Sequence, residues 1–167
     1  MTDIFRPGLI ATTIICAAAY FLHITTFYYI LKWVPVIVVQ LGFQPSTAGG
    51  VLTWYMAGGA TGGAVLGFLT IRYGVKGLTM AVLALSTVLV MIFGQVAQPP
   101  ADLGNLGLVC FFAGFFTNAG IVGLYAIFAH AYPTHVRATG TGFAIGVGRG
   151  RSEEHTSELQ SRLHLVC

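Results

Sequence analysis

Acidic residues are nearly absent from most of this chain. Its 167 residues include five Asp and Glu, and only Asp3 and Asp102 precede position 151. About a quarter of the residues in a soluble globular domain are charged, whereas 8% are charged here. The shortage of charge excludes an ordinary soluble domain and indicates a protein that is largely surrounded by lipid.

Cysteine is also scarce, and its positions predict no disulfide. Cys16 and Cys110 lie within apolar stretches, where a cysteine acts as a small hydrophobic residue. The basic residues are scattered and form no patch, so the sequence predicts no nucleic-acid partner. No paired carboxylates, His/Cys cluster, Ser/His/Asp arrangement or phosphate-binding loop is recognisable, so we expect neither an enzyme nor a cofactor.

Long apolar runs dominate what is present. A helix needs about 20 apolar residues to cross a bilayer. Four runs meet this length and cover residues 9–39, 47–71, 78–96 and 106–131. A fifth run begins near Thr139. The predicted fold class is all-α, a polytopic membrane helix bundle of about five transmembrane helices.

Polar segments separate these runs, at residues 42–47, 72–77, 98–105 and 132–140. Pro45 is expected to end the preceding helix, and Ser46 or Thr47 to cap the next one. Lys and Arg occur before the first run and in the second and fourth loops, but not in the first and third. Because basic loops stay in the cytoplasm, this alternation predicts a cytoplasmic amino terminus.

Residues 151–167 do not match the rest of the chain. A polar, acidic run interrupts the fifth apolar stretch, and residues 151–161 match, residue for residue, the translation of a sequencing-library adapter. We therefore expect a membrane domain at 1–150, a non-native tail at 151–167, and a missing natural carboxy terminus. The alternative is a genuine polar cytoplasmic tail.

Two adjacent sets of small residues mark the second apolar run. Glycines recur every fourth position at 59, 63 and 67, and again at 58 and 62. Such spacing lets another helix approach closely. The neighbour is either a helix of the same bundle or a second copy of the chain.

The loop from Gly67 to Lys76 resembles a short cytoplasmic motif of the major facilitator superfamily, Gly-x-Leu-x-Asp-Arg-x-Gly-Arg-Arg. Ile71 stands at the acidic position and Val75 at one basic position. The resemblance implies a role at the cytoplasmic gate for Gly67, Arg72, Gly74 and Lys76. The alternative is an ordinary tight basic loop.

A second pair of motifs narrows the resemblance to the aromatic acid:proton symporters of that superfamily. The run 132–143, with Gly146-Val-Gly-Arg149 after it, resembles their loop between helices ten and eleven, and 21–35 resembles their helix seven. The resemblance implies that residues 1–150 are helices seven to eleven of a twelve-helix transporter. It also implies that Arg137 belongs to the gate, and that the amino-terminal half and helix twelve are absent.

An ionisable residue within a membrane helix is a candidate for function, because burying it is costly. Lys32 shares a helix face with Tyr28 and Tyr29, which provides a cation for a carboxylate and rings for an aromatic body. Alternatively, Lys32 extends to the outer interface beside Trp33.

Three further polar residues lie within the apolar runs. Arg149 lies far along the fifth run and is the second candidate for the anion's charge. Asn118 either binds substrate or joins two helices, and His23 either relays protons or bonds to a neighbouring helix.

The resemblance thus implies part of a secondary transporter of the bacterial inner membrane. Proton-coupled uptake of an aromatic or other organic acid by alternating access is the expected function. The expected partners are a small organic anion, protons, the lipid bilayer and the missing amino-terminal half. No Asp or Glu lies within a spanning run, so the chain should not couple protons by itself. The alternatives are a transporter of a sugar, dicarboxylate or drug, and a non-transporting membrane scaffold.

Overall fold

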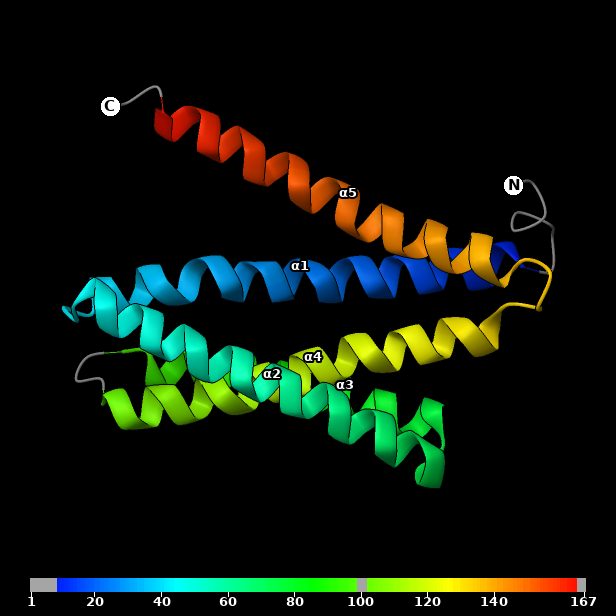
Figure 1. Cartoon of the computed structure of the whole chain (residues 1–167), viewed down its shortest axis with the longest axis horizontal. Helices are drawn as coiled ribbons and strands as arrows, with labels where there is room; N and C mark the ends of the chain where they lie inside the picture. Colours follow the sequence, from blue (N-terminus) through cyan, green and yellow to red (C-terminus); the bar gives the residue numbers. More distant parts are fainter. Residues whose placement is uncertain (1–8, 99–101, 165–167) are drawn as a thin grey trace. The chain divides into compact units, whose positions relative to one another are not determined.

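The part of the chain that the structure describes folds into five α-helices (Figure 1). The computed structural model describes residues 9–98 and 102–164, with side chains for 9–98 and 102–150. The helices are α1 (Ile10–Gln40), α2 (Pro45–Tyr73), α3 (Val75–Val96), α4 (Leu103–Ala131) and α5 (Arg137–His164). These described residues contain no strand, and the all-α prediction is confirmed.

Within residues 9–98 and 102–164, three helices, α1, α3 and α4, are long and apolar enough to cross a membrane. The sequence predicts four such runs, and α2 is the one that does not qualify. It is long enough, at 29 residues, but its many glycines and hydroxyl residues lower its mean hydropathy. These small residues let α2 lie close to the backbone of α4.

The turn between α1 and α2 differs from the prediction at its capping residue. Gly42 has φ +90°, and Pro45 is the first residue of α2, with Gln44 at the N-cap and no side-chain cap. Proline at the first helical position has the φ angle that the helix needs and lacks only an N–H that would be unbonded there. The predicted cap at Ser46 or Thr47 is therefore wrong, because the helix already includes both residues.

A single residue joins α2 to α3. Gly74 ends one helix and begins the next, with φ +82° and ψ 146°. The predicted six-residue loop at 72–77 is wrong in length, because this glycine turns the chain without further loop residues. The fourth connection is also shorter than predicted, since α5 begins at Arg137.

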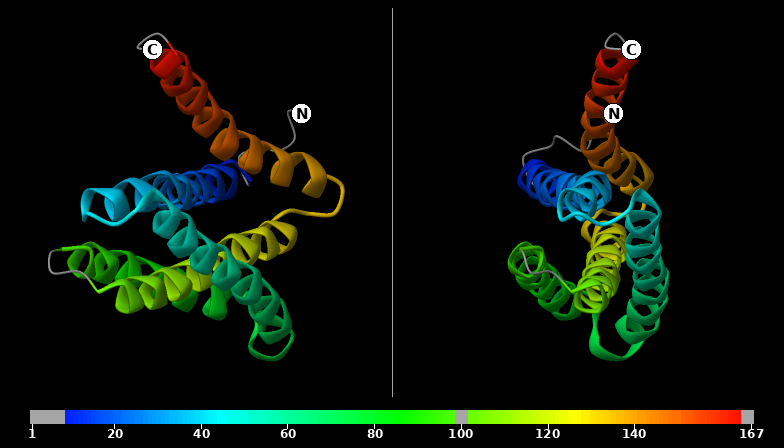
Figure 2. Two further views of the ribbon diagram at one scale, coloured as in Figure 1. Left: turned by 60° about the vertical axis from the view of Figure 1, so that its left-hand side comes forward. Right: turned by 90° about the vertical axis from the view of Figure 1, so that its left-hand side faces the viewer.

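The chain divides into two compact units, and the larger is Tyr29–Ile127. Within it, α2 crosses α4 at very short range (Figure 2). A Cβ on Gly58 would lie 2.8 Å from the backbone carbon of Phe111, and one on Gly62 would lie 2.7 Å from that of Phe115. The predicted close approach is confirmed, and the neighbour is a helix of the same chain.

The third helix completes this unit. Leu66 of α2, Val82 of α3 and Ala119 of α4 form a buried cluster. Gly123 of α4 faces the Thr79 side chain of α3. Small residues on α4 therefore admit neighbours on two sides.

The second unit is Met1–Tyr28 with Phe128–Cys167. Its described contacts join α1 to α5, where Tyr20 and Ile24 lie against Gly148. At the start of α5, Gly140 lies against the ring of Tyr132. The α5 helix continues past position 150 to His164 without a break, so the predicted boundary of the tail coincides with no helix end.

Candidate functional site

Arg149 and Tyr20 form a hydrogen bond within the unit that contains α5. The Arg149 Nε–H donates to the Tyr20 hydroxyl oxygen, over 3.3 Å. The two residues are 129 positions apart in the sequence and belong to α5 and α1. The bond therefore fixes an ionisable group of one helix against a polar atom of another.

The Tyr20 side chain is held on several sides. It is fully buried, and its ring meets that of Phe128 edge-on, with centroids 5.9 Å apart. On another side the ring contacts the backbone at Gly148, where a Cβ would lie 2.6 Å from its Cε1 atom. Arg149 itself is exposed, so its guanidinium can meet a ligand while Tyr20 cannot move freely.

Sequence reasoning selected Arg149 but missed Tyr20. The available signal was a tyrosine in an apolar helix, because a buried phenol usually finds a hydrogen-bond partner. The spacing of α1 and α5 in the sequence gave no means of pairing the two residues.

The α1 candidates occupy an open face of their helix. Lys32 is exposed, as is Tyr29, at 57%. Tyr29 stacks on Trp33, with ring centroids 5.7 Å apart and an angle of 30° between the rings. Tyr28 is half-buried beside Phe27. This face offers a cation and aromatic rings together, as the sequence predicts, and its binding role stays a prediction.

Asn118 joins two helices. Its Nδ2 donates to the Gly59 carbonyl oxygen over 2.6 Å and lies next to Gly63. The amide therefore bonds α4 to α2 where the glycines bring the two backbones together. One of the two predicted roles of Asn118 is thus observed, and substrate binding stays a prediction.

Four of the five predicted gating residues lie at or between helix ends, and Gly67 lies within α2, because the helix continues to Tyr73 where the sequence predicted a loop. Arg72 is exposed, with its guanidinium carbon 6.0 Å from the centre of the Tyr73 ring, and Lys76 is exposed in the first turn of α3. Arg137 is the first residue of α5, and its Nε–H donates to the Tyr132 carbonyl oxygen over 3.4 Å. Gly67 is exposed and has open space around it.

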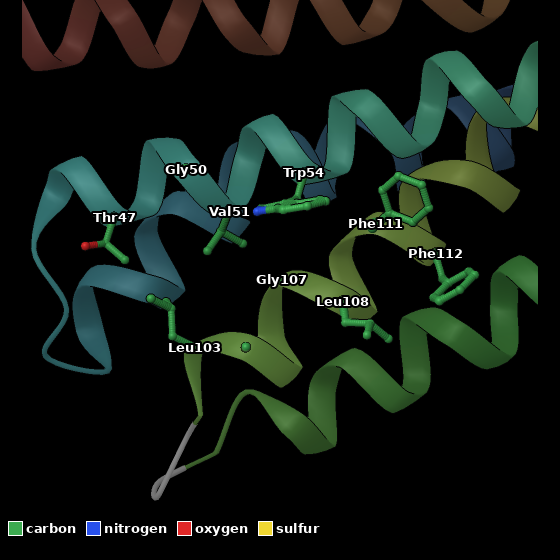
Figure 3. Close-up of a pocket in the computed structure, with 10 residues that line it drawn as sticks. Thr47, Gly50, Val51, Trp54, Leu103, Gly107, Leu108, Phe111 and Phe112 are labelled. Atoms are coloured by element: carbon green, nitrogen blue, oxygen red, sulfur yellow. The ribbon is translucent and has the colours of Figure 1, made fainter.

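An apolar pocket of about 620 Å³ lies between the first turns of α2 and α4. Figure 3 shows Val51 and Trp54 of α2 facing Phe111 of α4, with Leu108 also in the lining. Thr47 is the most polar of its described lining residues, and none of them is charged. The pocket suits an apolar body, and its described lining offers no cation to pair with a carboxylate. It includes none of the sequence-predicted site residues.

Comparison with known proteins points to transporters of aromatic acids. A 3-(3-hydroxy-phenyl)propionate transporter of Escherichia coli is 33% identical over 87% of this chain and 35% of its own length. A benzoate transport protein of Acinetobacter baylyi is 27% identical over 87% of this chain and 30% of its own length. A gallate transporter of Pseudomonas putida is 26% identical over 78% of this chain and 28% of its own length.

The chain spans about a third of the length of the curated relatives that it matches. No family model matches the chain. No solved structure matches it either. All three relatives are transporters of aromatic acids. The resemblance of this chain to the aromatic acid:proton symporters of the major facilitator superfamily is therefore confirmed over most of its length.

Proposed function

We propose that residues 1–150 are helices seven to eleven of a proton-coupled transporter of aromatic acids, and that residues 151–167 are not native to it. The observation that carries this proposal is the similarity to aromatic acid transporters over 87% of the chain. An exposed arginine, fixed by a second helix, adds a group suited to a carboxylate.

Two kinds of side chain bind the two parts of the ligand: cations bind its carboxylate, and aromatic rings contact its ring. Arg149 binds the carboxylate of the acid, because a guanidinium matches its two oxygens in geometry and charge. Lys32 offers a second cation, and Tyr28 and Tyr29 offer ring faces. Asn118 contributes by holding α2 on α4 and, as we propose, by lining the path.

Alternating access requires the ligand to lie between two halves that move against each other. In this proposal Arg72, Lys76 and Arg137, with Gly67 of α2 and the turn at Gly74, close the cytoplasmic side. Arg72 lies in the last turn of α2, where a cation interacts favourably with the free carbonyl groups, and Arg137 donates to the Tyr132 carbonyl oxygen. The amino terminus lies in the cytoplasm and the protein in the bacterial inner membrane.

We assign proton coupling to the amino-terminal half of the complete transporter. A proton-coupled transporter needs a group that gains and loses a proton in the pathway. Asp102, the only Asp or Glu between positions 9 and 150, lies just before α4 and is exposed. The carboxylates that carry protons would therefore come from the amino-terminal helices.

The test is uptake by the complete gene that includes this coding sequence. The gene is expressed in a bacterium without aromatic acid uptake, and accumulation of labelled benzoate is measured with and without a proton uncoupler. We expect accumulation that unlabelled 3-phenylpropionate and gallate reduce and the uncoupler abolishes. Competition by a sugar, a dicarboxylate or a cationic drug in place of the aromatic acids would contradict the proposed substrate class. A stable oligomer without any uptake would favour a membrane scaffold.

A further inference from the structure

We infer that Tyr20 is a positioning residue for Arg149, and that it sets the orientation in which the guanidinium receives the carboxylate of the transported acid. The inference rests on the proposed function and adds a residue to its site.

The hydrogen bond uses the one N–H of the guanidinium that can orient it without occupying its outer edge. A guanidinium is planar and has five N–H donors, one on Nε and two on each Nη. The bond from Nε to the Tyr20 oxygen fixes the plane and the direction of the group. A carboxylate approaching that plane then meets donors in a defined geometry, which a freely rotating arginine provides only part of the time.

Tyr20 can act in this way because it is itself immobile. Its ring is fully buried, meets Phe128 at an angle of 71° and lies against the backbone at Gly148. Gly148 precedes Arg149 directly, so the same turn of α5 supplies both the arginine and the space for the tyrosine ring. A larger residue at position 148 would displace the ring and with it the hydroxyl group.

The hydrogen-bond acceptor of Arg149 belongs to a different helix from the arginine itself. Tyr20 belongs to α1 and Arg149 to α5. The orientation of the guanidinium therefore depends on how these two helices pack within their unit. A ligand that requires this orientation will bind best when that packing is intact.

The test compares Tyr20→Phe with Tyr73→Phe in the complete transporter. Tyr20→Phe removes the hydroxyl but keeps the ring that packs on Phe128. Tyr73→Phe is the matched control, because it removes a tyrosine hydroxyl beside another arginine, Arg72, where the contact is with the ring. Tyr73 is exposed at the end of α2.

The measurements are the KM and Vmax of labelled benzoate uptake and the inhibition constant of benzamide, the neutral analogue. Hydrogen bonds to charged groups are worth enough that we expect the KM for benzoate to rise about tenfold in Tyr20→Phe. Vmax should stay within about twofold, and the inhibition constant of benzamide should stay unchanged, because benzamide has no carboxylate. Tyr73→Phe should resemble the wild type in all three values.

A second measurement follows Arg149 directly in the 167-residue chain, reconstituted in lipid nanodiscs. Phenylglyoxal modifies accessible arginines, and mass spectrometry reports the rate at Arg149. We expect Tyr20→Phe to raise this rate, because a guanidinium that Tyr20 no longer holds is more mobile and presents its two Nη atoms, where phenylglyoxal reacts, more often.

Each outcome decides one claim. An unchanged benzoate KM and an unchanged Arg149 rate in Tyr20→Phe would overturn the inference, while the proposed function would stand. Equal changes for benzoate and benzamide would also overturn it, since they indicate a general packing defect. If the wild type takes up no aromatic acid, the proposed function fails first and the positioning role fails with it.

Discussion

Asn118 illustrates how one polar side chain holds two membrane helices together. Its amide donates to the backbone carbonyl of Gly59 and lies close to Gly63, where the backbones of α2 and α4 approach each other. A polar group within the bilayer needs such a partner, because lipid offers none. The bond therefore belongs to the same contact as the glycines around it.

Replacing Asn118 with Ala should lower the free energy of unfolding by about 0.6–2 kcal/mol, the range for hydrogen bonds between membrane helices. Thermal or denaturant unfolding in detergent measures this loss. Asn105→Ala is the control, because Asn105 is exposed in the first turn of α4. A wild-type stability combined with a weaker affinity for benzoate would instead identify Asn118 as a ligand-binding residue alone.

Gly74 occupies a backbone conformation that is nearly closed to other residues. With φ +82° and ψ 146°, it lies close to a region that essentially only glycine adopts, where strain costs about 1–3 kcal/mol. Gly74→Ala should therefore reduce the stability of the α2–α3 pair by about that amount. Unfolding in detergent measures the effect against Gly77→Ala, which has open space within α3. Equal stability of the two variants would contradict the role given to Gly74.

At the scale of helices, the contact between α2 and α4 is made largely by backbone. Gly58 and Gly62 face the backbone of Phe111 and Phe115, and Gly114 faces the backbone of Tyr55 from the opposite side. Glycines on both helices thus alternate with large residues on the partner. This arrangement lets van der Waals contact replace the hydrophobic driving force that lipid removes.

An added methyl group should separate these two helices. Gly58→Ala and Gly62→Ala each place a Cβ on a main-chain carbonyl that cannot rotate away, so we expect a loss of about 1–3 kcal/mol for each. Gly49→Ala, in the first turns of the same helix, has nothing within 4 Å and serves as the control. Unfolding in detergent compares the three variants. Stability in Gly62→Ala equal to that of Gly49→Ala would show that α2 does not pack in this way.

The sequence predicted those elements whose signal is local and periodic. Glycines four residues apart indicated the close face of α2, and apolar runs placed each helix to within a few residues. It failed at Pro45 and Gly74, because one residue of special backbone geometry can replace several loop residues. It missed the partnership of Tyr20 with Arg149, because that contact depends on the packing of two helices far apart in the chain.

At the scale of the whole chain, the distribution of basic residues sets the expected orientation. Arg72 and Lys76 flank the α2–α3 link, and Arg137 begins α5. Reporter fusions measure this orientation. Green fluorescent protein fused after Gly77 should fluoresce, as it does in the cytoplasm, and alkaline phosphatase fused after Gln44 should be active, as it is in the periplasm. Exchange of the two activities would reverse the proposed orientation.

The chain expressed alone should transport nothing. A central ligand site requires two halves, and the chain matches only about a third of the length of its relatives. Cells that produce only this polypeptide should accumulate no labelled 4-hydroxybenzoate above cells with an empty vector. Accumulation under these conditions would mean that five helices suffice for a complete pathway.

The one-residue link at Gly74 has a consequence for how the protein enters the membrane during synthesis. α2 is not apolar enough to qualify as a span by itself, whereas α3, which follows it directly, has the highest mean hydropathy of the qualifying helices, at 2.2. With a single residue between them, the translocon receives the two as a helical hairpin, in which α3 compensates for the poor partitioning of its glycine-rich neighbour. Lengthening the link with a flexible spacer would uncouple the two insertion events and strand α2 at the membrane surface.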